Sequence, residues 1–178
     1  MIIEKEVISQ IYRPYFFVKG IFDIDAKYFK KRIDEGVQNS SLNYKTQVVG
    51  QQTDWKFFNK DENFGIFLFQ LLDYLERLNL ELGSFSLGES WGLIEKLGDY
   101  TKKHSHSPTH PASFFSGALY LNDHHQKLYF PEINQEITPQ KGRAVLFSSF
   151  LKHYTKRNAT HKEKYAISFN FHGQGFEK

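Results

Sequence analysis

The amino-acid sequence predicts a mainly β protein, a barrel or jelly roll with helices packed outside it. Three observations indicate this class. Aromatic residues make up 17% of the 178 residues, with 18 Phe and 10 Tyr, and such side chains favour pleated, half-buried surfaces. Beyond Gly83, short apolar segments alternate with Gly, Pro, Asn and Asp, which is typical of successive strands. No helical periodicity interrupts that run.

The beginning of the chain combines extended segments with a short helix. Apolar residues are dense from Ile8 to Phe22, around a proline and a glycine, which indicates strands or extended chain. Asp25 can then cap a short amphipathic helix in which Phe29 and Ile33 lie four residues apart. A polar, loop-like stretch follows, with room for a short strand at 46–49.

The longest helical pattern begins near Asp61. Its apolar residues repeat at helical spacing over about five turns. They are Phe64, Phe67, Leu68, Leu71, Leu72, Leu75 and Leu78. We expect this helix to cover one face of a sheet and to end by Gly83.

Six strands are predicted after this helix. They are placed at Phe85–Glu95, Tyr100–His106, Ser113–Leu121, Lys127–Phe130, Arg143–Phe150 and Lys164–Phe171. A chain of 178 residues has the usual length of one domain. We therefore expect residues 1–178 to form a single domain, in which a helical and extended half at about 1–84 packs on a β core at about 85–172.

Two of these strands have one apolar face and one small or polar face, because successive side chains of a strand point to opposite sides. In one, Lys164, Ala166, Ser168 and Asn170 alternate with Tyr165, Ile167, Phe169 and Phe171. In the other, Ser116, Ala118 and Tyr120 alternate with Phe115, Leu119 and Leu121. The small faces suit the wall of a cavity around one lysine. A lysine on an exposed sheet face and a tyrosine in the core would produce the same pattern.

Composition excludes other classes. The net charge is +3 with acidic and basic residues interspersed, so no nucleic-acid partner is expected. The absence of cysteine excludes disulfides, cysteine zinc sites and a thiol nucleophile. The N-terminus has acidic residues early and no uninterrupted apolar run, and no stretch reaches membrane-spanning length. We expect a soluble, cytoplasmic protein without a membrane partner.

Three of the eight histidines have a spacing that suits one metal ion. His104 and His106 are two residues apart, so on an extended strand both imidazoles point to the same face. His153 follows the predicted strand 143–150, and an inward-pointing histidine at a strand end can supply a third ligand. Such a set leaves coordination positions open for small ligands, and Lys164 could hold the far carboxylate of an acidic co-substrate.

The other histidines are weaker candidates. His124 and His125 fall in a polar connection and are expected to be solvated, His161 lies in a charged loop, and His172 is near the end of the last strand. His110 lies between two prolines and is at best an outer contact of the site.

A series of short motifs then carries a resemblance over about residues 85–172. They are Glu89-Ser-Trp91, Gly98-Asp-Tyr100, His104-x-His106, Ser116-Gly-x-x-Tyr-Leu121, Gly142-Arg-x-x-x-Phe-x-Ser149, His153 and Lys164-x-x-x-Ser-Phe-Asn170. In order and spacing this stretch resembles the 2-oxoglutarate/Fe(II)-dependent oxygenase superfamily, most of all its prolyl-hydroxylase-like bacterial and bacteriophage branch. The resemblance implies a double-stranded β-helix (jelly roll).

The resemblance also implies roles for individual residues. His104 matches the first iron ligand, His153 matches the distal histidine, and His106 stands where a carboxylate ligand is usual. Lys164 occupies the place of an arginine that binds the distal carboxylate of 2-oxoglutarate, and Tyr120 matches a tyrosine near that co-substrate. The usual Arg-x-Ser is Lys164-x-Ala166 here.

The third metal ligand is open at this point. Either His106 completes a three-histidine site, which we prefer because its two-residue spacing is local, or Asp99 or Asp123 supplies a carboxylate. We expect Ser168 and Asn170 to line the co-substrate site beside the lysine.

The implied activity is Fe(II)- and 2-oxoglutarate-dependent hydroxylation of an unactivated C–H bond in a small-molecule or peptide substrate. A prolyl or other amino-acid side chain is favoured, and ascorbate is the expected reductant in vitro. One alternative is a cupin-type three-histidine metalloprotein, a dioxygenase or isomerase, because Gly98-x5-His104-x-His106 also fits the start of a cupin motif. The other is a non-catalytic jelly roll that binds a sugar or a protein.

Overall fold

The protein is described here by a computed structural model, which describes residues 3–10, 13–42, 46–78, 84–106 and 113–173. The strands are β1 (Ile3–Gln10), β2 (Arg13–Ile21), β3 (Val48–Val49), β4 (Gln51–Gln52), β5 (Phe85–Glu95), β6 (Tyr100–Thr101), β7 (Ser113–Tyr120), β8 (Leu128–Phe130), β9 (Gln135–Ile137), β10 (Arg143–Ser148), β11 (Tyr154–Thr155) and β12 (Lys164–Gly173). The helices are α1 (Ala26–Gln38) and α2 (Glu62–Arg77).

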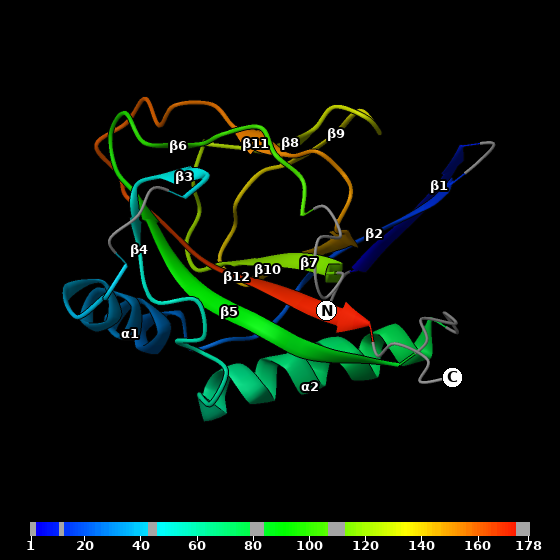
Figure 1. Ribbon diagram of the computed structural model, residues 1–178, viewed down its shortest axis with the longest axis horizontal. Coiled ribbons are helices and arrows are strands. Elements are labelled where there is room, and N and C mark those ends of the chain that lie inside the picture. Colours follow the sequence, from blue (N-terminus) through cyan, green and yellow to red (C-terminus); the bar gives the residue numbers. More distant parts are fainter. Residues whose placement is uncertain (1–2, 11–12, 43–45, 79–83, 107–112, 174–178) are drawn as a thin grey trace.

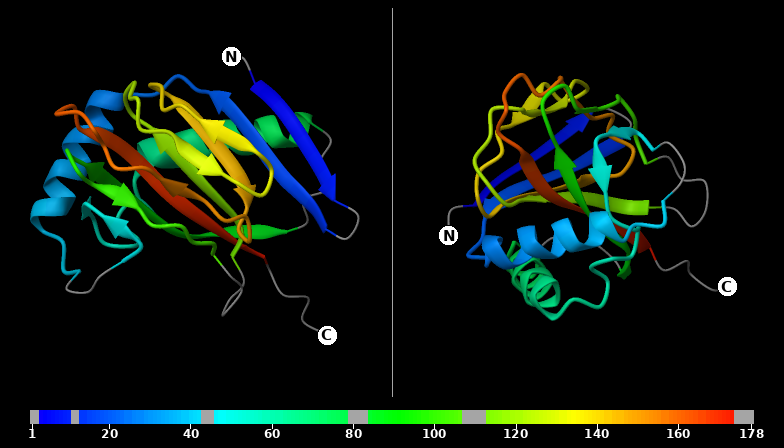
Figure 2. Two further views of the ribbon diagram at one scale, coloured as in Figure 1. Left: turned by 90° about the horizontal axis from the view of Figure 1, so that it is seen from above. Right: turned by 90° about the vertical axis from the view of Figure 1, so that its left-hand side faces the viewer.

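Two layers of antiparallel strands face each other (Figures 1 and 2). The larger layer is a seven-stranded sheet in the order β1-β2-β10-β7-β12-β5-β4. The opposite layer consists of a three-stranded sheet, β11-β8-β9, and a two-stranded sheet, β3-β6. Neighbours in the large sheet are mostly far apart in sequence, as in Greek-key jelly rolls. The predicted class, a mainly β double-stranded β-helix with flanking helices, is confirmed.

Both helices lie on the outer face of the large sheet (Figures 1 and 2). Asp25 caps α1 as predicted, since its carboxylate accepts a hydrogen bond from the backbone N of Tyr28 at 2.9 Å. Asp61 caps α2 in the same way, at 3.0 Å from the N of Phe64. The second helix ends at Arg77, and the predicted stop at Gly83 lies outside the described residues.

Two apolar cores result from the alternation of side chains along the strands. The first lies between the helices and the sheet and includes Phe67 of α2 with Phe169 of β12, whose ring centroids are 6.0 Å apart. The second lies between the two layers and includes Tyr120 and Ala166. The apolar faces predicted for β7 and β12 therefore pack under the helices, and their small faces point inward.

Several strand predictions need correction. The strand predicted at Tyr100–His106 ends at Thr101, because the chain bends away before the histidines. Strands β4, β9 and β11 were not predicted, and with two or three residues each they are too short for alternation to be recognised. No helix in the described part of the chain is long and apolar enough to span a membrane.

Candidate metal centre

Backbone hydrogen bonds bring the three candidate histidines together from two distant segments. His104 and His153 form an isolated antiparallel bridge, with N–O distances of 3.1 Å and 2.9 Å. The backbone N of His106 donates to the O of Ser149 at 2.7 Å. These three bonds join the chain after β6 to the chain between β10 and β11. The side chains of His104 and His106 thus point to the same side from a bent segment and not from a regular strand.

The imidazoles converge. One ligand atom from each of His104, His106 and His153 lies within 4.8 Å of the other two. The Nε2 atoms of His104 and His106 are 3.2 Å apart. The described cluster contains neither Asp99, whose Oδ2 accepts from the N of Lys96 at 2.8 Å, nor Asp123, whose carboxylate binds the N of a loop residue at 2.8 Å.

Hydrogen bonds assign the same tautomer to all three rings. The Nδ1 of His104 lies 2.7 Å from the O of Lys102, and the Nδ1 of His153 lies 2.9 Å from the O of Leu151. A carbonyl oxygen can only accept, so both Nδ1 atoms carry the proton. Both Nε2 lone pairs are therefore available to a metal ion.

His106 obtains the same tautomer from side chains. Its Nδ1 lies 2.7 Å from Oδ1 of Asn170 and 2.8 Å from Oγ of Ser116. The Ser116 hydroxyl is also within 2.8 Å of that Asn170 oxygen. These contacts hold the ring behind its ligand atom, which is the usual place of an outer-sphere partner of a metal-binding histidine. In the structure Asn170 thus holds the imidazole of His106, whereas the sequence predicted that Asn170 lines the co-substrate site.

Burial keeps the three rings neutral. It lowers the pKa of His104, and it lowers the pKa of His106 to about 4, helped by the nearby His104. Burial also holds the pKa of His153 well below its usual value, with further lowering from the other two rings. Neutral imidazole is the form that binds metal.

The donor set fits a divalent transition-metal ion. Three unprotonated Nε2 atoms that face one another repel unless a cation lies between them, and imidazole suits Fe, Zn, Ni and Cu. A carboxylate is missing from the set, so the three protein ligands contribute no charge to the ion.

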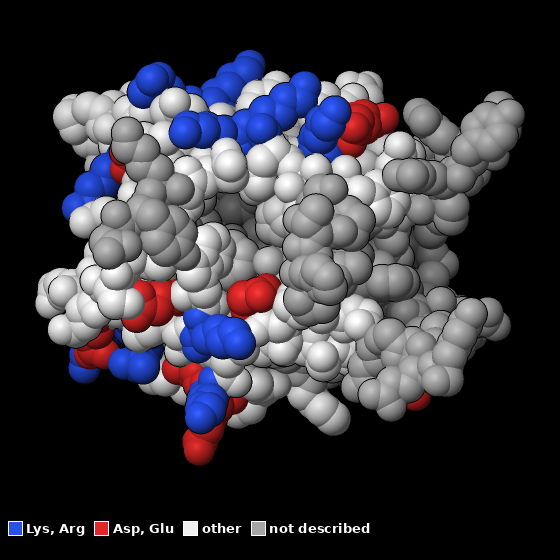
Figure 3. All heavy atoms as spheres, viewed as in Figure 1, with Lys and Arg blue, Asp and Glu red and all other residues white. Residues whose placement is uncertain are grey.

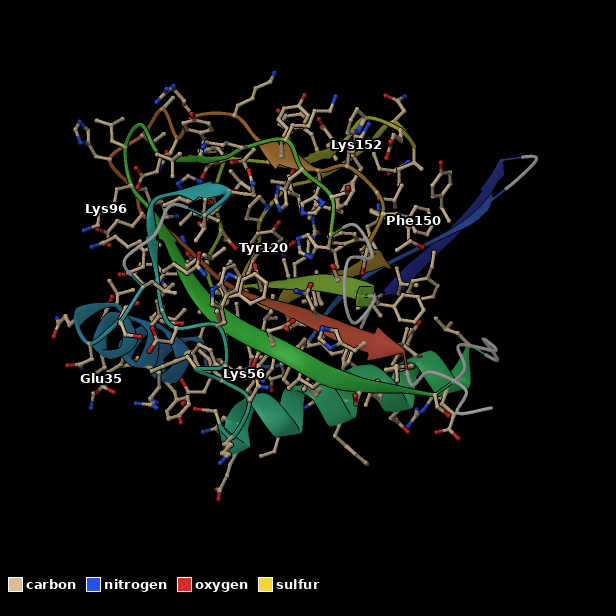
Figure 4. All side chains as sticks on the ribbon, viewed as in Figure 1. Glu35, Lys56, Lys96, Tyr120, Phe150 and Lys152 are labelled. Atoms are coloured by element: carbon tan, nitrogen blue, oxygen red, sulfur yellow. The ribbon has the colours of Figure 1, made fainter. Side chains whose placement is uncertain are left out.

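A pocket leads from the histidines into the space between the layers, lined by Tyr120, Lys164, Ala166 and Ser168 among others. Figure 4 shows Tyr120 between the two layers, and Figure 3 shows the surface hollowed in this part of the molecule. Burial raises the pKa of Tyr120, as does the nearby Glu95, so its hydroxyl stays protonated. The small face predicted from the alternation of β7 and β12 is the wall of this pocket.

Lys164 has a partner that the sequence reasoning missed. Its ammonium forms an ion pair with Glu95, and the two residues are 3% and 1% exposed. The hydroxyls of Thr101 and Thr155 also lie 3.2 Å from the Glu95 carboxylate. Glu95 shares the inward face of β5 with Trp91, so the alternation of that strand could have placed it in the pocket. Its pairing with the lysine depends on the register of β5 and β12.

The other histidines of the described residues are not part of the cluster. The prediction that His124 is solvated is wrong, since it is buried, with Nε2 2.9 Å from the O of Lys162. His161 is exposed. His172 lies 3.1 Å from the carboxylate of Glu89, and His110 is outside the described residues.

The fold is that of 2-oxoglutarate-dependent oxygenases. The structure is similar to a viral collagen prolyl hydroxylase from Paramecium Bursaria Chlorella virus-1 in complex with 2OG, with a TM-score of 0.68 at 15% identity over 90% of this chain and 96% of that one. A prolyl-4-hydroxylase from Pseudomonas putida has a TM-score of 0.64 at 20% identity over 89% and 93% of the two chains.

HygX from Streptomyces hygroscopicus, with nickel and 2-oxoglutarate bound, has a TM-score of 0.65 at 13% identity over 91% and 84%. No protein-family model and no curated protein sequence matches this chain. At these identities the likeness establishes a common fold, and the chemistry has to be argued from the site.

Proposed function

We propose that this protein is a non-haem Fe(II) dioxygenase that depends on 2-oxoglutarate and hydroxylates an unactivated C–H bond. The observation that supports this most is the set of three neutral histidines that line the same pocket as a buried lysine. A substrate with a prolyl or other amino-acid side chain, free or in a peptide, belongs to the same proposal, as does a cytoplasmic location.

His104, His106 and His153 would hold the iron through their Nε2 atoms. Bound there, Fe(II) would supply the activation of dioxygen that accompanies oxidative decarboxylation of a 2-oxo acid. The protein's own contribution is binding and orientation. Apolar walls such as Leu128 and Phe147 exclude water from the pocket, and Tyr120 offers a protonated hydroxyl.

Lys164 is proposed to bind the distal carboxylate of 2-oxoglutarate. Its ammonium has three donors, so it can keep one hydrogen bond to Glu95 and still offer others to the co-substrate. The Glu95 carboxylate nevertheless repels a second carboxylate in the same pocket. We therefore expect Glu95 to weaken the binding of 2-oxoglutarate compared with a site in which the lysine is unpaired.

Succinate formation is the direct test. The protein with Fe(II), ascorbate and 2-oxoglutarate should produce succinate slowly without a second substrate, and faster with the right one. His153→Ala should stop turnover, whereas His161→Ala, at an exposed position, should leave it unchanged. A folded, iron-loaded wild type that makes no succinate with peptide, amino-acid or nucleotide substrates would favour the cupin-type metalloprotein or the binding module.

A further inference from the structure

A second hollow adjoins the candidate metal centre. Its lining includes Gln52, Trp55 and Asn170, and it shares Trp91, His104 and His106 with the pocket that contains Lys164. The two hollows therefore meet at the same pair of histidines. If 2-oxoglutarate takes the pocket with the lysine, the second hollow is where another molecule can approach the same metal ion.

Two of the residues that line this hollow have a buried hydrogen-bond donor without a partner. Trp91 is 5% exposed, and its Nε1 is buried without a hydrogen-bond partner in the described structure. The same is true of Nε2 of Gln52, whose other amide atom, Oε1, lies 3.2 Å from the hydroxyl of Thr46. Buried polar groups are nearly always paired, so an unpaired donor needs an explanation.

The register of the sheet places these donors on one side. Gln52 of β4 pairs directly with Leu93 of β5, and Trp91 lies two residues before Leu93 on the same face of that strand. Diagonal neighbours of this kind are within reach of a single bound group. Gln52 and Trp91 are thus neighbours in the sheet although they lie far apart in the chain.

The rest of the hollow is apolar or neutral. The indole rings of Trp55 and Trp91 pack edge to face, with centroids 4.7 Å apart. No carboxylate is among the described residues that line this hollow. An indole N–H can only donate, and an amide NH2 does the same, so the bound atom must be an acceptor. A cationic group would find no carboxylate among those lining residues.

We infer that this hollow is the substrate subsite and that it binds a carbonyl oxygen, of a carboxamide or a carboxylate, attached to an apolar ring or chain. Nε1–H of Trp91 and Nε2–H of Gln52 donate to that oxygen, and the indole rings contact the apolar part. That the bound molecule is a substrate rests on the proposed oxygenase activity. Its binding to the hollow does not, because binding can be measured without turnover.

The chain contains two Trp, and both line this hollow, whereas of the two only Trp91 is among the residues that line the pocket with Lys164. The full-length protein, loaded with diamagnetic Zn(II), is titrated with three probes of one shape: cyclopentanecarboxamide, cyclopentanecarboxylate and cyclopentylmethylammonium. The indole N–H resonance that disappears in Trp91→Phe should shift with the carboxamide, the carboxylate or both, and should not respond to the ammonium. The first two probes also distinguish a neutral from a charged carbonyl group.

Two variants test the donors separately. Trp91→Phe keeps an aromatic ring and Gln52→Leu keeps the side-chain volume, and each should weaken probe binding about 2- to 10-fold through the loss of one hydrogen bond. Gln51→Leu changes the exposed neighbour on the same strand and should bind like the wild type.

Equal binding of all three probes, no binding of any, or wild-type affinity in both donor variants would overturn the inference. Its failure is distinct from a failure of the oxygenase. A protein that makes succinate but shows no shift refutes only the subsite, and a protein that binds the carbonyl probes but makes no succinate refutes only the oxygenase.

Discussion

Lys164 of β12 and Glu95 of β5 are directly opposite each other in the sheet and form an ion pair inside the protein. Both side chains are almost completely buried. The attraction within such a pair roughly compensates for the loss of hydration, but removal of one partner leaves an isolated buried charge. The pair therefore determines both the charge of the pocket and the cost of changing it.

Replacing Glu95 and replacing Lys164 should change the KM for 2-oxoglutarate in opposite directions. Glu95→Gln removes the competing carboxylate and should lower the KM for 2-oxoglutarate, whereas Lys164→Met should raise it, because a charge-assisted contact contributes about 1.5–3 kcal/mol. Both variants should also lose roughly 3–5 kcal/mol of stability. Steady-state kinetics and urea unfolding measure the two effects.

The exposed pair of Lys96 and Glu163 offers the control. Its atoms are 3.4 Å apart at side chains that are 50% and 40% exposed, so Lys96→Met should cost less than about 1 kcal/mol and leave the KM unchanged. An unaltered KM in Lys164→Met would mean that the lysine has only a structural role.

The loss of the Asn170 side chain should weaken metal binding, beyond any effect on the stability of the fold. Its Oδ1, 2.7 Å from Nδ1 of His106, selects the tautomer that presents Nε2. Asn170→Ala should weaken the binding of Co(II) about 10- to 100-fold, the usual cost of losing such a support. Calorimetric titration measures it, and Asn39→Ala, at an exposed helix end, serves as control. Unchanged Co(II) affinity would exclude this positioning role.

His124 should make the fold sensitive to acid. Burial, followed by the charge of the nearby Lys164, lowers its pKa below the ordinary value of 6.5. Its neutral form satisfies two neighbours, since Nδ1 accepts from the N of Gln126 at 3.0 Å and Nε2 donates to a carbonyl. The unfolded chain therefore binds more protons than the folded one, and stability falls as the pH drops through 6.5 and below.

Comparing the variants with the wild type separates the effect of His124 from that of the three histidines at the candidate metal centre. Between pH 7.5 and pH 5, His124→Gln should lose less unfolding free energy than the wild type, and His161→Gln, at an exposed position, should lose the same amount as the wild type. Equal losses in all three proteins would show that His124 does not titrate on unfolding.

Gly142 precedes β10 and should tolerate no side chain. It has a φ of 79°, and a Cβ there would meet the carbonyl oxygen of Phe22. Gly98 has a φ of 88°, but nothing lies within 4 Å of its Cβ position. We expect Gly98→Ala to cost about 1–2 kcal/mol from the left-handed backbone alone, and Gly142→Ala clearly more. Thermal unfolding compares the two, and equal losses would show that the clash with Phe22 is relieved.

Local periodicity accounts for what could be predicted. The alternation of Ile167, Ser168 and Phe169 assigns each side chain to a face, and the helical spacing around Phe67 assigns α2, because both patterns depend on neighbouring residues only. The cap predicted at Asp25 and the helix start predicted near Asp61 are equally local, and both aspartates cap their helices in the structure. The two-residue spacing of His104 and His106 indicated a shared side, which the structure realises without a regular strand.

The amino-acid sequence by itself thus determined the mainly β class, the flanking helices, the inward faces of β7 and β12 and the candidate metal-binding histidines. Only the tertiary structure decided that His153 meets His104, that Glu95 pairs with Lys164, and that Trp91 and Gln52, each with an unpaired buried donor, line one hollow. The physical reason is that each of these contacts depends on the register between strands that are distant in the chain. A short turn fixes the register of a hairpin, but no turn joins these strands directly, so their register depends on which faces pack into the core.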